Sequence, residues 1–323
     1  MVLNGEESEW SEVLSGVPQG SVLGPTLFLI FINDIDRAVD VTSSVLLKFA
    51  DDTKVARVVE SQEQQAELQK TIDRLVEWSG EWQMLFNSDK CHILHLGGNN
   101  GNYEYTMGGR VLETVEYEKD VGVIVHKSLK PTMQCARAAN RANAILGQLS
   151  RAVSYRDKDT FMRLYKVYVR PHLEYAVVSW SPWTAQDKEM LEKVQRRAVG
   201  MVSNIRGRTY EARLTELDMT TLADRRVRGD MIATYKIMSG KDKVEPGLFF
   251  DLVADGVGPR TRAATGAPSI RAKGWRIDIR KYSFGLRVTS GWNSLPDSLR
   301  SVGTVLEFKI GYDEWVMGRM LGE

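Results

Sequence analysis

The chain has 323 residues, 43% of them hydrophobic, which is enough to bury a substantial core in two domains or three small ones. Its formal net charge is +1, and its two cysteines cannot form a disulfide framework, so a reducing intracellular compartment is expected. No apolar run approaches the roughly 18 residues of a membrane span, and the acidic N-terminus has no basic start or apolar stretch. Neither a membrane protein nor a secreted precursor is therefore expected.

Charge is distributed unevenly along the chain. Residues 1–125 carry nine Lys and Arg against twenty-one Asp and Glu, a net of −12, whereas residues 126–323 carry a net of +13. An acidic half beside a basic half is typical of a protein that collects cations at one place and a polyanion at another. Two solvated surfaces of opposite sign that dock on each other would give the same distribution.

The first predicted elements are a hairpin, a loop and a helix. The pair Asn4-Gly5 favours a tight type I′ turn, which predicts a hairpin over residues 2–13. Residues 16–21 form a loop rich in Gly and Pro. Pro25 suits the first position of an apolar helix, which is predicted over residues 26–39.

A second hairpin is predicted over residues 45–59. Its first strand alternates Val45, Leu47 and Phe49 with Ser44, Leu46 and Lys48. The pattern breaks at Ala50-Asp51-Asp52 and resumes at residue 53. Two carboxylates are therefore expected at the tip of this hairpin.

The next stretch predicts one helix and several short strands. Ser61 and Gln64 match a capping box, and the apolar residues that follow recur at helical spacing: Leu68, Ile72, Leu75, Trp78 and Trp82. Strands are predicted near residues 91–96, 103–107, 110–115 and 121–125, with Gly108-Gly109 as a tight turn. The first 125 residues are thus expected to be α+β.

Helical periodicity dominates the rest of the chain. Helices are predicted over residues 131–152, 158–180, 185–202 and 222–239, and Trp180 and Trp183 are expected in the core. Residues 240–300 have weak periodicity and much Gly, Pro and Arg, which predicts loops, short strands and poorly ordered connections.

The adjacent carboxylates Asp51 and Asp52 have two interpretations. An isolated Asp-Asp pair usually marks only a turn. A turn that holds divalent cations also requires Asp oxygens, because Mg²⁺ takes one or two carboxylates together with substrate phosphates. Apolar strands on both sides would hold such carboxylates rigidly.

Several motifs read together resemble a known family. The order and spacing of Gly16-Val17-Pro18-Gln19-Gly20-Ser21, Phe49-Ala50-Asp51-Asp52, and Phe86-Asn87 with Lys90 resemble the later palm motifs of reverse transcriptases. Further motifs resemble the LINE-type non-LTR retrotransposon enzymes, particularly the Jockey-like group: Asn33-Asp34, Arg170-Pro171-His172 with Leu173-Glu174-Tyr175, and Trp292-Asn293-Ser294-Leu295-Pro296. The resemblance covers essentially the whole chain.

The resemblance implies roles for particular residues. Asp51 and Asp52 match carboxylates that hold Mg²⁺ during transfer of a deoxynucleotide to a primer end. Contact with the nucleotide or template is implied for Gly16, Pro18, Gln19, Gly20, Phe49 and Ala50. Lys90 matches a lysine proposed to protonate pyrophosphate, although a surface lysine beside Asp89 is an equally simple interpretation.

The resemblance also implies an architecture and partners. An α+β fold is expected, with a partial palm at residues 1–125 built from an antiparallel sheet with helices, a helical thumb at 126–203 and a basic C-terminal region at 204–323. The implied partners are an RNA template, a DNA primer and deoxynucleoside triphosphates. The palm motif with the remaining aspartate precedes Gly16 in complete relatives, so an N-terminally truncated, inactive copy is expected. The glutamates Glu6, Glu7, Glu9 and Glu12 more simply form a solvated face.

The basic half contains a candidate nucleic-acid surface. Its expected contacts are Arg260, Arg262, Arg271, Lys273, Trp275, Arg276, Arg280 and Lys281. Bases could stack on the interleaved rings of Trp275, Tyr282, Phe284 and Trp292 while the cations hold phosphates. Alternatively, these aromatics form a small core and the arginines its solvated rim.

Other classes of protein are less consistent with the sequence. Cys91-His92 with His95 suggests zinc, but a three-residue step along a strand places the two histidines on opposite faces. No phosphate-binding Gly-Lys-Ser/Thr loop and no Gly-x-Ser-x-Gly elbow is present. The remaining alternatives are a non-catalytic RNA-binding protein and a remnant that binds nothing.

Overall fold

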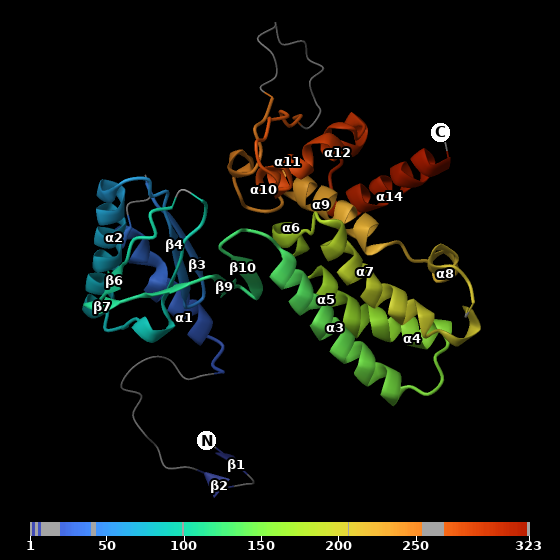
Figure 1. The fold of residues 1–323 in the computed structure, drawn as a ribbon, viewed down its shortest axis with the longest axis horizontal. Coiled ribbons are helices and arrows are strands. Elements are labelled where there is room, and N and C mark those ends of the chain that lie inside the picture. The colour runs from blue at the N-terminus through green and yellow to red at the C-terminus, as the bar shows by residue number, and fades with distance from the viewer. Residues whose placement is uncertain are drawn as a thin grey trace, which may run out of the picture. The chain divides into compact units, whose positions relative to one another are not determined.

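The computed structural model describes residues 2–3, 6–7, 20–39, 43–98, 100–205, 207–253 and 268–321 (Figure 1). The fold is mixed α+β, mostly helical with small sheets. It divides into two compact units, an N-terminal unit at Met1–Val121 and a C-terminal unit at Gly122–Glu323. No helix within the described ranges is both long and apolar enough to span a bilayer.

The N-terminal unit begins with the predicted hairpin. Strand β1 (Val2–Leu3) pairs antiparallel with β2 (Glu6–Glu7), and Leu3 lies opposite Glu6 across the turn. The pairing of residues 2–3 with 6–7 agrees with the predicted hairpin, whereas Asn4 and Gly5 lie outside the described residues. Residues 8–19 lie outside the described residues, and with them Glu9, Glu12 and most of the predicted loop.

The predicted helix at 26–39 consists of two kinds of helix. Helix α1 (Gly24–Phe31) has Pro25 in its first turn, as expected, and then tightens into the 3₁₀ helix η1 (Ile32–Ala38). The change of helix type coincides with Asn33, Asp34 and Asp36. The side chains of Asp34 and Asp36 reach outside this helix, to Trp78 and to Lys48.

The hairpin that carries the paired carboxylates is present. Strands β3 (Val45–Phe49) and β4 (Asp52–Ala56) pair antiparallel, with Phe49 opposite Asp52. Leu46 and Val55 pack against a core formed by η1 and the following helix. Val45, Leu47 and Phe49 are instead more than half exposed, so the outer face of this hairpin carries three exposed apolar side chains.

Helix α2 (Gln62–Glu81) covers both cores of the N-terminal unit. Ser61 caps it by accepting a hydrogen bond from the Gln64 N–H at 3.3 Å, as the capping box predicts. Leu75 and Trp78 pack with η1 and the β3–β4 hairpin, whereas Ile72 packs with a second core around Tyr105 and Leu112.

The short strands of this unit pair differently from the expected antiparallel sheet. Strands β6 (Thr106–Met107) and β7 (Arg110–Val111) form a hairpin across Gly108-Gly109, both with positive φ, as predicted. Strand β5 (His92–Leu94) pairs in parallel with β8 (Glu113–Val115). The stretch between them is long enough for a crossover connection, which a parallel pair requires. Strand β9 (Tyr117–Asp120) follows.

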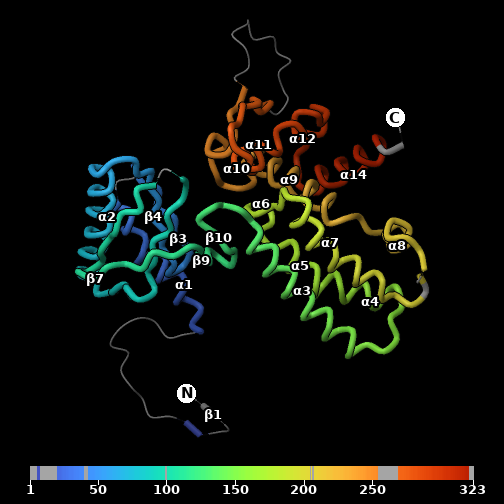
Figure 2. The backbone as a smooth tube through the Cα atoms, in the orientation of Figure 1, coloured from blue at the N-terminus to red at the C-terminus, as the bar shows by residue number. Residues whose placement is uncertain are grey.

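The C-terminal unit opens with strand β10 (Val123–His126) and then becomes helical. Its first core is built by α3 (Thr132–Ala152), α7 (Ala185–Gly200) and the segment between them, and α3 and α7 lie side by side (Figure 2). Leu146, Phe161, Tyr165 and Leu191 are fully enclosed there. Two of the predicted helices are thus confirmed nearly to their ends.

The predicted helix at 158–180 is broken into pieces. They are α4 (Lys158–Leu164), the π-helix η3 (Tyr165–Val169), α5 (Arg170–Glu174) and α6 (Val177–Trp180). Pro171 lacks the N–H that would continue the helical hydrogen bonding, so the preceding turn widens. The chain then turns at Ala176, which has φ +50°.

Helix α9 (Leu222–Met238) joins the first core to a second one. Leu222 belongs to the first, while Met231 and Tyr235 pack with Trp292 and Phe308 in the second. The 3₁₀ helix η4 (Ser203–Ile205) and helix α8 (Tyr210–Glu216) precede α9.

The expectation of loops at 240–300 holds for more than half of the described residues in this range, but short helices, not strands, lie between the loops. The described part contains η5 (Pro246–Leu248), α10 (Asp278–Lys281), α11 (Phe284–Arg287), α12 (Thr289–Asn293) and α13 (Asp297–Arg300), followed by α14 (Val305–Leu321). One isolated bridge joins Leu252 and Ile270. Helices of four or five residues are too short to show a helical period in the sequence.

Candidate active site

The paired carboxylates lie at the tip of the β3–β4 hairpin. Because Phe49 pairs with Asp52, the turn consists of Ala50 and Asp51, and Asp52 begins strand β4. Ala50 has φ +53°, a left-handed conformation that is uncommon for a residue with a Cβ. Both carboxylates are exposed to solvent.

Polar contacts to η1 fix the strand that leads to this turn. The Lys48 ammonium lies 2.7 Å from the Asp36 carboxylate and donates to the Asn33 carbonyl at 3.3 Å. On the same helix, Asp34 accepts a hydrogen bond from the Trp78 indole at 3.1 Å. The Asn33-Asp34 pair thus connects η1 to both the hairpin and α2.

The outer face of the hairpin combines apolar and charged groups. Residues opposite each other in an antiparallel pair point to the same face, so Asp52 shares this face with Phe49, and Lys54 with Leu47. Phe49 is 63% exposed, and Lys54 forms an ion pair with Asp120. Asp51 and Asp52 make no ion pair with any described residue.

The donor set at the turn fits part of a magnesium site. Two carboxylates completed by substrate phosphates satisfy a hard divalent cation. In the described part of the chain, no three or more His, Cys, Asp or Glu side chains are grouped so that they could hold a metal. Asp51 and Asp52 would therefore need oxygen ligands from elsewhere.

Most of the predicted Gly/Pro loop is not described. Gly16, Pro18 and Gln19 lie outside the described residues, so the structure gives no position for them relative to the turn. Gly20 is exposed and has φ +83°, which a Gly adopts without strain. The Gly24 N–H donates to the Ser21 hydroxyl at 3.0 Å and anchors the end of the loop to α1.

Lys90 ends the short 3₁₀ helix η2 (Ser88–Lys90) and is exposed. The Asp89 carboxylate pairs with Arg110 at 2.5 Å, so Lys90 is not its partner. Phe86 packs against the hairpin core, and Asn87 caps η2 by accepting from the Asp89 N–H at 3.1 Å. No hydrogen bond among the described residues joins Lys90 to Asp51 or Asp52.

The histidines near Cys91 have separate partners. His92 lies 2.7 Å from Glu118, whereas the His95 ring lies 6.4 Å from that of Tyr105. Cys91 is partly buried with the core around Tyr105.

The predicted nucleic-acid surface divides into paired and unpaired cations. Lys273 lies 3.2 Å from Asp251. Arg271, Arg276 and Arg280 are exposed, and their side chains make no ion pair with a described residue. Arg260 and Arg262 lie outside the described residues.

The aromatic residues between these cations also fall into two groups, buried and exposed. Trp292 is fully buried and its indole donates to the Pro268 carbonyl at 3.1 Å, and Phe284 packs against the same core. Trp275 is 52% exposed. Tyr282 stacks on Trp183, which is only partly buried and so is not the core residue the sequence suggested. Trp292 and Phe284 therefore belong to a core, whereas nucleic-acid binding by the exposed residues stays a prediction.

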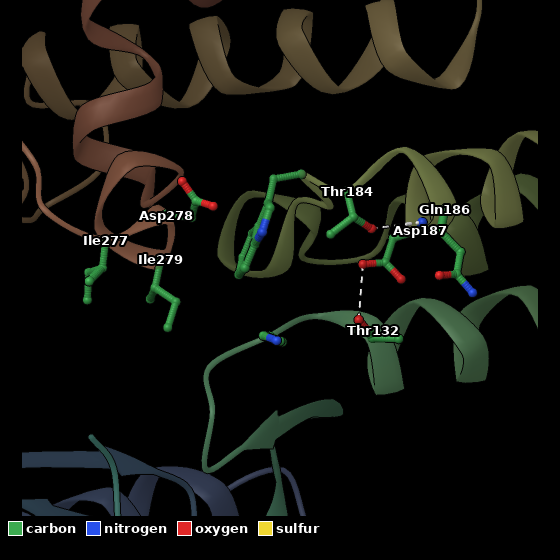
Figure 3. A pocket seen from close by; sticks show the side chains of 9 residues that line it. Thr132, Thr184, Gln186, Asp187, Ile277, Asp278 and Ile279 are labelled. Carbon is green, nitrogen blue, oxygen red and sulfur yellow. Dashed lines mark hydrogen bonds between the residues drawn. The ribbon is translucent and has the colours of Figure 1, made fainter. Parts of the chain in front are cut away.

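A cavity of about 530 Å³ lies in the C-terminal unit, where the segment before α10 faces the N-terminal ends of α3 and α7 (Figure 3). Its lining residues are Lys130, Thr132, Trp183, Thr184, Gln186, Asp187, Ile277, Asp278 and Ile279. The Thr132 hydroxyl donates to Asp187 at 3.1 Å, and Thr184 accepts from the Asp187 N–H at 3.1 Å. Sequence reasoning missed this cavity, although Thr184 and Asp187 have the spacing of a helix cap.

The Cys135 side chain is buried on α3 near Asp187 and Arg226. Burial raises the pKa of the Cys135 thiol to about 12, and the nearby Asp187 carboxylate contributes. Cys135 is therefore a packing residue of α3 and not a nucleophile.

Comparison with known proteins finds a family match in the N-terminal part of the chain. Residues 1–137 match the family model described as reverse transcriptase (RNA-dependent DNA polymerase). The RNA-directed DNA polymerase from mobile element jockey of Drosophila funebris is 26% identical over 228 residues, which is 67% of this chain and 24% of that protein. Its counterpart from Drosophila melanogaster is 25% identical over 54% of this chain and 20% of its own length.

A third relative belongs to a different mobile element. The probable RNA-directed DNA polymerase from transposon X-element of Drosophila melanogaster is 24% identical over 59% of this chain and 22% of its own length. The chain thus spans less than a quarter of each of these curated relatives. No solved structure matches it.

Proposed function

Since the N-terminal part of the chain is a reverse transcriptase domain related to those of the jockey and X-element retrotransposons, we propose that Asp51 and Asp52 are metal-ligating carboxylates of RNA-directed DNA synthesis. The position of the pair supports this most directly: Asp51 lies in a two-residue turn and Asp52 begins the next strand, both open to solvent. The expected substrates are an RNA template, a DNA primer end and a deoxynucleoside triphosphate. Bound Mg²⁺ would neutralise phosphate charge and acidify the attacking hydroxyl.

The neighbouring residues have supporting roles in this proposal. Phe49 presents an exposed ring beside Asp52, and the turn at Ala50 holds Asp51 clear of the strands. Gly16, Pro18, Gln19 and Gly20 would contact the nucleotide or template, and Lys90 would give a proton to the leaving pyrophosphate. Residues 126–203 would act as a thumb.

Metal-dependent nucleotide binding tests the proposal. Two carboxylates can hold a metal–triphosphate complex, so the chain should bind a fluorescent deoxyadenosine triphosphate in Mg²⁺ and lose this binding in EDTA. Asp51→Asn should weaken binding at least tenfold, because it removes a charged metal ligand. Glu77→Gln removes one charge from an exposed position on α2 and should leave binding unchanged.

The same preparation should show no measurable primer extension on an RNA template. The described residues group no third metal ligand with the pair, and loss of a metal anchor typically reduces turnover by orders of magnitude. Nucleotide binding that Asp51→Asn leaves intact would contradict the proposal. Extension that vanishes in Asp51→Asn would instead support the metal assignment and show that another carboxylate, such as one of the N-terminal glutamates, completes the site.

A second candidate function is RNA binding without catalysis. It is favoured by the exposed side chains of Arg271, Arg276 and Arg280, which make no ion pair with described residues. In that case residues 204–323 would bind template RNA electrostatically, and the hairpin would be only scaffold.

A further inference from the structure

Aromatic rings and a cation form a continuous row on the C-terminal unit. The Lys281 ammonium lies 5.5 Å from the ring centre of Trp275 and 5.1 Å from that of Tyr282. Tyr282 in turn stacks on Trp183, with ring centres 5.8 Å apart and planes 3° from parallel. Trp183 lines the cavity of Figure 3, so the row leads from an exposed tryptophan to a recess.

Free cations flank this row. Arg276 and Arg280 are exposed beside Trp275 and Lys281, and Lys130 lies on the rim of the cavity. None of the three forms an ion pair with a described residue. Rings on which bases can stack, together with cations that hold phosphates, are the features by which proteins bind single-stranded nucleic acid.

The cavity is lined by two carboxylates, Asp187 and Asp278, and by the potential hydrogen-bond donors Lys130, Thr132 and Trp183. Asp278 is exposed at its edge, and Asp187 is 1% exposed with one oxygen already bonded to Thr132. Gln186 adds an amide, and Ile277 and Ile279 add apolar surface. In Figure 3 Asp278 and Asp187 come from opposite sides, one from α10 and one from α7.

We propose that a single strand lies along the row from Trp275 to Trp183 and places one unpaired base in the cavity, which prefers a base with an exocyclic amino group. A carboxylate accepts a hydrogen bond from the amino group of cytosine, whereas it repels the carbonyl oxygen that uracil presents at the same position. The choice of nucleic acid as ligand rests on the proposed function, but the base preference rests on the cavity alone.

Cytosine and uracil give a matched comparison because both are pyrimidines of similar size. Fluorescence anisotropy of labelled oligo(C) and oligo(U) of 12 nucleotides, with the full chain at one salt concentration, should show oligo(C) bound about fivefold more tightly. Asp278→Asn should reduce this ratio toward one. Trp275→Ala should weaken both oligonucleotides about fivefold and keep the ratio, because that ring lies outside the cavity.

Two variants serve as controls. Asp159→Asn removes the same charge from an exposed position on α4, which contributes nothing to the cavity, and should preserve the ratio. Tyr155→Ala removes a ring that is 66% exposed and should leave the affinity unchanged. Parallel titrations with oligo(dC) and oligo(dT) distinguish RNA from DNA as the strand that supplies the base.

Equal affinity for oligo(C) and oligo(U), together with equal affinity for oligo(dC) and oligo(dT), would overturn the proposal, as would an Asp278→Asn variant with an undiminished ratio. The absence of any binding at low salt would overturn it too. The Asp51→Asn variant should keep the full base preference, so failure of the metal proposal and failure of this one are distinguishable.

Discussion

Arg287 shows how a basic side chain can belong to the architecture of the C-terminal unit. Its guanidinium makes two hydrogen bonds of 2.8 Å to Asp230 and one of 2.6 Å to the Val178 carbonyl. The side chains of Arg287 and Asp230 are 14% and 10% exposed. One residue of α11 thus connects α9 and α6, and it is not available to bind phosphate.

Replacement of Arg287 by Ala should therefore destabilise the protein. It leaves the buried Asp230 carboxylate without its partner, and the expected loss is about 3–5 kcal/mol of unfolding free energy. Arg276→Ala, at an exposed position, should change stability by no more than about 0.5 kcal/mol. Urea unfolding followed by tryptophan fluorescence measures both. Similar stabilities for the two variants would show that the buried ion pair is not important for the fold.

At the scale of elements, residues 271–282 form a basic segment that ends in α10. Lys273 is paired with Asp251, whereas Arg276 and Arg280 project from the segment without a partner among the described residues. Tyr282 stacks on Trp183 at the end of this segment, and most of the segment's side chains are exposed. An element that exposes cations beside an exposed aromatic ring is suited to bind a polyanion such as a nucleic acid.

Binding of single-stranded RNA by this segment should depend steeply on salt, because each neutralised phosphate releases counterions. Replacing Arg276, Arg280 and Lys281 together by Ala should weaken binding and reduce the log-log slope by about 2, at roughly 0.7 per contact on a single strand. Trp275→Ala should weaken binding with little change in slope. Titrations at two salt concentrations measure these slopes, and an unchanged slope in the triple variant would place the phosphate contacts elsewhere.

Across the whole molecule, local signals in the sequence were enough to predict several elements correctly. The cap at Ser61, the Gly108-Gly109 turn and the strands around Asp51 depend on residues close in sequence, and all three are present. The parallel pairing of Leu94 with Val115 was not predictable, since it depends on contacts between distant residues. The family motifs located the candidate metal ligands, but no local signal distinguished buried Trp292 from exposed Trp275.

Binding of a divalent metal at the turn between β3 and β4 can be tested directly. Fe²⁺ in place of Mg²⁺, with ascorbate and peroxide, generates hydroxyl radicals at the metal and cleaves the nearby backbone. We expect cleavage around residues 50–53 that excess Mg²⁺ suppresses. It should be abolished in a variant with Asp51→Asn and Asp52→Asn and retained in Glu77→Gln. Cleavage confined to other parts of the chain, or unchanged in the double variant, would contradict metal binding at this turn.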